Sequence, residues 1–176
     1  MSRRIRFIPE EGSLVEITCR TDQGRYLLRP DPVIDDILLG VLGRAQRLYP
    51  VEICGFSFLS SHYHLLLWVP DARSMARFMW YFQTNAAREV GRLTDWPNGV
   101  WSDRYTSIPV GDEPAAQVDR LRYVLRLLRS LNCPAGVISV RRYIGNWWRG
   151  WCARSSPTLR RKGSSRAASL WAQKPF

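Results

Sequence analysis

The chain has 176 residues, of which 45% are hydrophobic and 23% are charged, a balance typical of one globular domain with its own core. No apolar run reaches the length that spans a bilayer, and the stretch Met1–Phe7 lacks the apolar segment of a signal peptide. The four cysteines show no Cys-x-x-Cys spacing, which favours reduced thiols over a zinc site. We therefore expect a cytoplasmic protein with no membrane partner.

The net charge of +11 is concentrated at one end of the chain. Residues 1–119 contain 13 arginines and all 15 acidic residues, whereas residues 120–176 contain 13 Lys or Arg residues and no acid. Four of the eight tryptophans also fall in the basic segment. Basic residues with aromatic residues between them suit a polyanion such as nucleic acid.

Apolar periodicity predicts three strands and one helix in the first 70 residues. Asp31 and Pro32 are typical of an N-cap and a first helical position, so the periodic segment Pro32–Leu48 is expected to be an amphipathic helix. The second and third strands form a hairpin, because only a two-residue turn separates them. The expected strands are Leu14–Arg20, Val51–Leu59 and His62–Val69.

Three further elements are expected in the second half of the chain. Ser74 is a candidate N-cap for a helix over about Met75–Leu93, and the extended segment Val100–Val110 is a candidate fourth strand or strand-like loop. A third helix is expected from Ala115 to about Arg129. Its expected buried stripe comprises Val118, Leu121, Leu125 and Leu128. Tyr123 falls away from that stripe, so we expect its side chain to be displayed and not to lie in the core.

The element order β-α-β-β-α-β-α predicts an α+β domain of the ferredoxin-like type, with an antiparallel sheet and helices on one face. The other face of such a sheet can stay open for a ligand. We assign residues 1–13 to an N-terminal arm, 14–131 to this domain, and 132–176 to a basic tail. That tail is expected to be poorly ordered, at least from about residue 150.

Two histidines, which are the only ones in the chain, lie two positions apart in the third expected strand. Because a strand has a period of two, His62 and His64 point to one face of the sheet, whereas Tyr63 points to the other and is expected to pack. Two imidazoles held side by side on a rigid strand can place two nitrogens on one metal ion. The alternative interpretation is an ordinary half-exposed sheet surface.

These segments resemble the single-tyrosine HUH transposases, in particular the IS200-like branch called REP-associated tyrosine transposases. The resemblance spans about residues 14–125, and its most specific mark is the His-bulky-His strand after a short turn. The Val-Trp-x-x-Arg-Tyr segment after the second helix is a further mark. The segments that carry the resemblance are Cys19–Arg25, Cys54–Leu67, Phe78–Met79, Gly99–Tyr105 and Leu121–Tyr123.

The resemblance implies a metal-dependent DNA single-strand endonuclease and strand transferase. His62 and His64 would hold Mg²⁺ or Mn²⁺, and Tyr123 would attack the scissile phosphate to form a 5′-phosphotyrosine link that a free 3′-OH later reverses. Tyr105 and Tyr143 are weaker candidates for the nucleophile. The implied partner is single-stranded or hairpin DNA in the bacterial nucleoid, and a homodimer is left open. The residues expected to contact DNA are Arg20, Arg25, Trp101, Arg104, Tyr105, Arg122 and Arg126.

The sequence departs from the family pattern in the third helix. Family members carry a polar side chain, usually Asn or Gln, one helical turn after the tyrosine, and this side chain completes the metal site. Leu127 stands at that position here and cannot bind a metal, and Asn132 would have to reach back. Beyond about Leu125 the resemblance fades, just where acidic residues disappear.

Two interpretations of the end of the chain stay open. It is either a basic DNA-binding tail whose tryptophans stack on bases, or a frameshifted or decayed end, which the loss of a ligand favours. The second interpretation makes a catalytically inactive descendant that binds structured single-stranded DNA the main alternative function. An RNA-binding module of similar topology would need an aromatic pair that is not visible, and a zinc hydrolase would need a third histidine.

Overall fold

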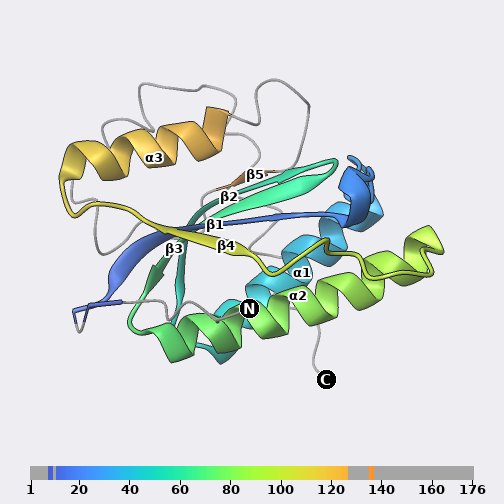
Figure 1. The fold of residues 1–176 in the computed structure, drawn as a ribbon, viewed down its shortest axis with the longest axis horizontal. Helices are drawn as coiled ribbons and strands as arrows, with labels where there is room; N and C mark the ends of the chain where they lie inside the picture. Colours follow the sequence, from blue (N-terminus) through green and yellow to red (C-terminus); the bar gives the residue numbers. More distant parts are fainter. Residues whose placement is uncertain (1–7, 10, 127–134, 137–176) are drawn as a thin grey trace, which may run out of the picture. The chain divides into compact units, whose positions relative to one another are not determined.

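The computed structural model describes residues 8–9, 11–126 and 135–136, and Figure 1 shows how their elements are arranged. The described elements, in chain order, are β1 (Ser13–Arg20), the 3-10 turn η1 (Asp22–Gly24), α1 (Pro32–Leu48), β2 (Glu52–Leu59), β3 (His62–Val69), α2 (Ala72–Thr94), β4 (Thr106–Pro109), α3 (Pro114–Arg126) and β5 (Ala135–Gly136). None of the described helices combines the length and the apolar character that crossing a bilayer requires. Of the expected tail, 132–176, only β5 falls within the described residues.

The described strands form one sheet in the order β4-β1-β3-β2-β5, and every neighbouring pair is antiparallel. β2 and β3 form the expected hairpin, and β1 lies between β3 and β4. An order of 4-1-3-2, with one helix after the first strand and another after the third, is the ferredoxin-like arrangement. The predicted fold class is therefore confirmed.

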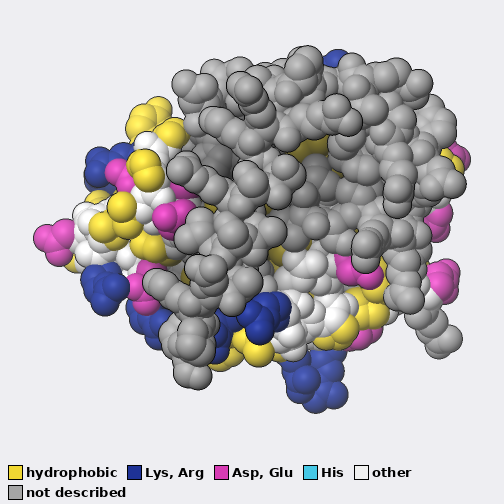
Figure 2. Space-filling view, turned by 180° about the vertical axis from the view of Figure 1, so that it is seen from behind, with side chains coloured by type: hydrophobic (Ala, Val, Ile, Leu, Met, Phe, Trp, Pro, Cys, Tyr) yellow, Lys and Arg dark blue, Asp and Glu magenta, His cyan; other side chains and the backbone are white. Residues whose placement is uncertain are grey.

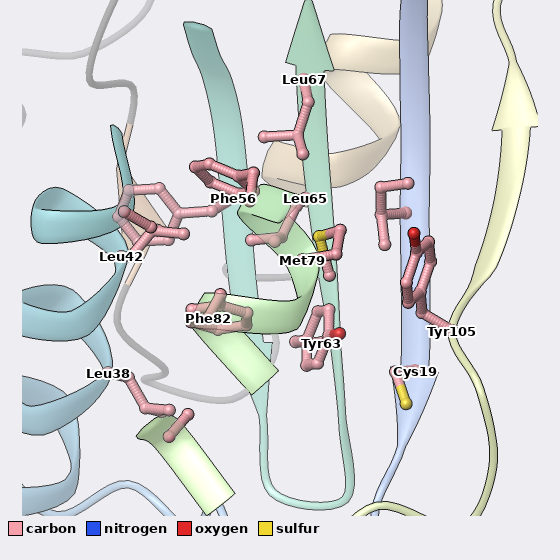
Figure 3. Close-up of a cluster of buried hydrophobic side chains, with 14 of the residues drawn as sticks. Cys19, Leu38, Leu42, Phe56, Tyr63, Leu65, Leu67, Met79, Phe82 and Tyr105 are labelled. Atoms are coloured by element: carbon pink, nitrogen blue, oxygen red, sulfur yellow. The ribbon is translucent and has the colours of Figure 1, made fainter. Parts of the chain in front are cut away.

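The helices α1 and α2 lie side by side against one face of the sheet, and the strands turn their apolar residues toward them (Figure 1). In β3 the residues on this face are Tyr63, Leu65, Leu67 and Val69, and all four side chains are fully buried. The ring of Phe82 from α2 lies 5.4 Å from the Tyr63 ring, centroid to centroid, inside this core (Figure 3). Tyr63 packs, as the alternation predicts. We call this side of the sheet the apolar face.

Capping residues set where the two long helices begin. Asp31 caps α1 as predicted, because its Oδ1 accepts hydrogen bonds from the backbone N–H groups of Val33 and Ile34. The prediction that Ser74 caps the second helix is wrong. Asp71 caps α2 by accepting the N–H of Ser74 at 2.8 Å, and the Ser74 hydroxyl donates to the other carboxylate oxygen. The helix therefore begins at Ala72, three residues earlier than expected.

The expected fourth strand is shorter than its extended sequence pattern. Only Thr106–Pro109 pairs in a ladder with β1. The segment before it is tied to the end of β1 by single contacts, namely a bridge between Thr21 and Trp101 and a hydrogen bond from the Ser102 N–H to the Arg20 carbonyl. An extended pattern thus does not distinguish a paired strand from a segment held at isolated points.

The helix α3 packs against the face of the sheet opposite to α1 and α2 (Figure 1), so the expectation that the helices lie on one face holds only for α1 and α2. Its fully buried residues are Leu121 and Val124, so the expected stripe is only partly correct. Val118 and Leu125 are half-buried, and Leu128 lies outside the described residues. A Cβ on Gly55 of β2 would come within 3.0 Å of the Leu121 Cδ1 atom. A glycine in the sheet therefore lets α3 approach closely.

Two of the four cysteines, Cys19 and Cys54, fall within the described residues, and both are free and buried. Burial raises the pKa of the Cys54 thiol to about 11, and it also raises the pKa of Cys19. Both thiols are thus protonated at neutral pH and unsuited to binding a metal. The other two, Cys133 and Cys152, lie outside the described residues.

Candidate active site

Polar side chains from three strands gather on the side of the sheet that α3 packs against. The antiparallel register places His64 opposite both Thr18 of β1 and Ser57 of β2, and it places His62 opposite Arg20. Residues opposite each other in antiparallel strands share a face. We call this side the polar face. Its polar members in the described strands include Glu16, Thr18, Arg20, Ser57, His62 and His64.

The two imidazole rings lie next to each other on this face, with centroids 5.3 Å apart. The Nδ1 atom of His62 is 3.2 Å from the Ser61 hydroxyl, and the Nδ1 atom of His64 is 2.7 Å from Glu16 Oε1. Among the described residues, both rings thus use Nδ1 for their hydrogen bonds. The Nε2 atoms of the two rings are not used in these contacts.

The local electrostatics keep His62 neutral. Partial burial lowers the pKa of its imidazole, and the neighbouring His64 and the guanidinium of Arg20 lower it further. A metal ion binds the unprotonated imidazole, so a depressed pKa favours metal binding at neutral pH.

The histidine pair fits a divalent cation. An ion about 2.1 Å from one nitrogen of each ring allows ring centroids up to roughly 6 Å apart, and the observed 5.3 Å lies within that limit. Among the described residues, no group of three or more His, Cys, Asp or Glu side chains could hold a metal ion. The remaining positions around such an ion would belong to water or to phosphate oxygens. Leu127, the predicted departure from the family pattern, lies outside the described residues.

Tyr123 reaches the same place from α3. Its ring meets the His64 ring edge-on, with centroids 5.8 Å apart, and its side chain remains 46% exposed. The guanidinium of Arg120, one helical turn earlier, lies 5.7 Å from the centroid of the Tyr123 ring. A displayed tyrosine, as predicted from the helical spacing, therefore stands beside the two histidines within one chain.

Glu16 belongs to this cluster, although it is not part of any of the sequence motifs described above. Its side chain is 2% exposed and accepts hydrogen bonds from His64 and from Arg120 Nη1, the latter at 2.8 Å. The signal available in the sequence is an acidic residue in the middle of an otherwise apolar stretch of β1. Its partners are 48 and 104 positions away, so that signal alone could not have identified them.

The arginines expected to contact DNA have different surroundings. Arg20 is exposed and faces the same side as His62, and Arg126 is exposed at the end of α3. Arg122 binds Asp119 at 3.2 Å and is half-buried. Arg25 and Arg104 lie over aromatic rings, those of Trp96 and Tyr105 respectively.

Tyr105 and Trp101, the two aromatic residues expected to contact DNA, pack against other residues of the chain. Tyr105 is 7% exposed and belongs to the buried cluster beside β1 (Figure 3). The indole N–H of Trp101 donates to the Gln83 carbonyl at 2.9 Å, and its ring packs edge-on against Tyr63. Burial of the Tyr105 ring disfavours both the expected contact with DNA and its role as the weaker candidate nucleophile. Tyr143, the other candidate, lies outside the described residues.

Basic and acidic side chains are mixed on the described surface that is visible in Figure 2. Figure 2 shows basic side chains toward the lower edge of the view from behind, with acidic side chains on both sides. The acidic residues disfavour a uniform contact with a polyanion there. The arrangement of the polar face around the histidines is the more specific feature.

Comparison with known proteins gives similarity at the level of structure. No protein-family model matches the chain, and no curated protein matches it. A solved structure of a REP-associated tyrosine transposase bound to a REP hairpin is similar to this chain, with a TM-score of 0.53, 15% sequence identity and coverage of 73% of each chain. A candidate transposase from Deinococcus radiodurans R1 has a TM-score of 0.45 and 17% identity, over 72% of this chain and 97% of that one. The chain has the fold of a REP-associated tyrosine transposase.

Proposed function

We propose that this chain is a transposase-type DNA single-strand endonuclease and strand transferase, with Tyr123 as its nucleophile. The observation that carries the proposal is the edge-on contact of Tyr123 with His64, beside His62 and on the face that Arg20 borders. Three residue types that a tyrosine-dependent nickase requires come together there from α3, β3 and β1. The fold supports the same function class.

In the proposed reaction the Tyr123 Oη atom attacks the phosphorus of a DNA phosphodiester. A bond forms between the phenolic oxygen and phosphorus, and the bond from phosphorus to the 3′ oxygen breaks. The phenolic proton leaves to solvent, and the departing 3′ oxygen gains a proton to become a 3′-OH. Attack by a 3′-OH on the phosphotyrosine reverses these changes and joins DNA strands. One phosphodiester replaces another, so the cycle needs no nucleotide cofactor.

A phenol is a weak nucleophile at neutral pH, so the site must assist the attack. His62 and His64 would hold Mg²⁺ or Mn²⁺ through Nε2, and the bound ion would supply Lewis-acid polarisation of the scissile phosphate. The half-exposed Tyr123 ring leaves its edge accessible to a DNA strand. Arg20, exposed beside His62, would bind a neighbouring phosphate and position the strand.

The proposed partner is single-stranded or hairpin DNA in the bacterial cytoplasm. A REP hairpin is bound to the structurally similar transposase, which supports this choice of substrate. Because the contact between Tyr123 and His64 lies within one chain, the proposed site does not need a second subunit to assemble.

Trapping of a covalent adduct tests the proposal. Incubation with a labelled hairpin oligonucleotide and Mn²⁺ should yield a protein–DNA species that survives denaturing electrophoresis. Tyr123→Phe and His62→Ala should each abolish the adduct, whereas Tyr26→Phe, which alters a tyrosine that is 74% exposed, should retain it. An adduct that persists in Tyr123→Phe would refute the assigned nucleophile.

A catalytically inactive DNA-binding protein is the second candidate function. It is favoured by the lack of a third His, Cys, Asp or Glu ligand at the histidine pair among the described residues. Such a protein would bind the hairpin without forming an adduct in either Mg²⁺ or Mn²⁺. In that case Leu127→Gln, which introduces a polar side chain four positions after Tyr123, should produce an adduct that Tyr123→Phe removes.

A further inference from the structure

A buried carboxylate with two different partners lies between the histidine strand and the tyrosine helix. Glu16 Oε1 lies 2.7 Å from His64 Nδ1, and Glu16 Oε2 lies 2.8 Å from Arg120 Nη1. The side chains of Glu16 and His64 are 2% and 10% exposed, so water does not compete strongly for the contact between them, whereas the Arg120 side chain is 37% exposed. Each carboxylate oxygen thus holds one group, from β3 and from α3 respectively.

The contact with Glu16 decides which nitrogen of His64 carries the proton. An ionised carboxylate can only accept hydrogen bonds, so Nδ1 must donate. In a neutral ring Nε2 then keeps its lone pair, which is the atom that a metal ion needs. Histidines that bind metals commonly donate their other N–H to a carboxylate, and this contact fixes both the tautomer and the ring orientation.

Through its contact with Arg120, Glu16 also influences the position of Tyr123, the proposed nucleophile. Arg120 precedes Tyr123 by one turn of α3, and its guanidinium lies near the tyrosine ring. A displacement of Arg120 relative to Glu16 would therefore move Tyr123 relative to His64. The carboxylate couples the position of the tyrosine to that of the imidazole.

A simple docking ion pair between β1 and α3 would also bury Glu16. Such a pair needs only Arg120, and buried ion pairs contribute little net stability compared with apolar packing. An ion pair of this kind would not require the second carboxylate oxygen of Glu16 to contact a histidine. The division of the two oxygens between Arg120 and His64 is what distinguishes the arrangement from docking alone.

We propose that Glu16 is a positioning residue that holds His64 in the Nδ1–H tautomer and, through Arg120, holds Tyr123 beside it. The inference rests on the proposed function of the polar face, but its test does not depend on DNA cleavage. The chain has only two histidines, so a long-range ¹H–¹⁵N spectrum of metal-free protein contains two imidazole patterns, and His62→Ala assigns them. His64 should show the Nδ1–H tautomer in alkaline buffer.

Glu16→Gln gives a specific expectation because the amide has only one acceptor oxygen. The guanidinium of Arg120 will take that oxygen, which turns the amide NH₂ toward His64 and forces its Nδ1 to accept. The spectrum should therefore change to the Nε2–H tautomer. Adding Arg120→Met to the same chain frees the amide oxygen for His64, and the Nδ1–H tautomer should return. Glu52→Gln, the same change on β2, which pairs with the other side of β3, should leave both rings unchanged.

Binding of Mn²⁺, measured from the electron paramagnetic resonance signal of the free ion, gives a second measure. Glu16→Gln should weaken Mn²⁺ binding about 10- to 100-fold, and the double variant with Arg120→Met should recover part of that loss. An Nδ1–H tautomer that persists in Glu16→Gln, together with unchanged Mn²⁺ affinity, would overturn the inference. Wild-type His64 in the Nε2–H tautomer would overturn it as well.

The outcomes separate this inference from the proposed function. A wild-type chain that forms no DNA adduct but shows the tautomer change in Glu16→Gln retains the positioning role and loses the nickase. A chain that forms the adduct equally well with Glu16→Gln retains the nickase and loses the positioning role.

Discussion

The two faces of this sheet are built from alternate residues of the same strands, yet one face packs into the core and the other carries polar side chains. Tyr63, between the two histidines, is fully buried, and it accepts a hydrogen bond from Gln83 and packs against Phe82. His62 and His64 point the other way and contact polar partners, the half-buried Ser61 hydroxyl and the buried Glu16 carboxylate respectively. The apolar face is closed by two long helices, α1 and α2, and the polar face is partly covered by the shorter α3.

The comparison shows how a site can be rigid without being buried in the core. The backbone of β3 is fixed by the packing of Tyr63 and Leu65 on one side, so the rings on the other side need few contacts of their own. Ligand atoms on the polar face can then remain available. Perturbations of the apolar face should therefore affect stability, and perturbations of the histidines and of Tyr123 on the polar face should affect chemistry.

The largest expected effect is on the apolar face. Phe82→Ala removes a fully buried ring that stacks on Phe58 and meets Tyr63 edge-on, and it should lower the free energy of unfolding by about 3–5 kcal/mol. Trp80→Ala, on the same helix but 66% exposed, should change it by less than about 0.5 kcal/mol. Urea unfolding measures both. A loss below about 1 kcal/mol in Phe82→Ala would contradict the assignment of this face as the core.

The next effect concerns how α3 meets the polar face. Gly55→Val places two methyl groups where a single Cβ already comes within 3.0 Å of Leu121, so α3 must shift. A shift of about 1 Å in the Tyr123 position should slow adduct formation on the order of 100-fold. Gly55→Ala, which a small rotation of Leu121 can accommodate, should slow it much less. Equal rates in the two variants would show that α3 does not set the position of Tyr123.

Local sequence patterns predicted the apolar face well because its determinants are local. The apolar alternation of β3 and the helical spacing after Asp31 depend on neighbouring residues, and both elements have the predicted bounds. The side on which His62 and His64 lie, and the displayed position of Tyr123, follow from the same periodicities. The N-cap of α2 was misplaced because Asp71 and Ser74 are both good capping residues, and only the backbone geometry chooses between them.

The polar face could be predicted only in part because its contacts depend on register and helix docking. The two contacts of Glu16 depend on the pairing of β1 with β3 and on the docking of α3. A local sequence pattern contains neither of these. Tyr105 was expected to contact DNA because it ends a segment that resembles the transposase family, but its ring lies in the buried core cluster. The isolated bridge between Trp101 and Thr21 could not be predicted either, because it depends on how two distant segments meet.

A smaller effect should show which side of the sheet contacts DNA, through the salt dependence of DNA affinity. Arg20→Gln removes an exposed cation beside His62 and should reduce the slope of log affinity for hairpin DNA against log salt concentration by about 1. Arg44→Gln removes an exposed cation from α1, the helix that packs on the apolar face, and should leave the slope unchanged. Titration of the hairpin at several salt concentrations gives both slopes. The same reduction in both variants would mean that DNA contacts α1 as well as the polar face.

The smallest effect tests a polar group that the polar face leaves unsatisfied. The Ser57 hydroxyl is fully buried opposite His64, and it is the only buried side-chain oxygen or nitrogen among the described residues for which no hydrogen-bond partner is found. Removing an unsatisfied hydroxyl abolishes its desolvation cost, so Ser57→Ala should raise the free energy of unfolding by up to about 1 kcal/mol, measured as a higher urea midpoint at unchanged slope. The Ser57→Ala chain should form the DNA adduct at the wild-type rate, because Ser57 touches neither proposed reactant. A loss of more than about 1 kcal/mol would instead show that the hydroxyl holds an ordered water beside His64, and the polar face would then include a solvent site.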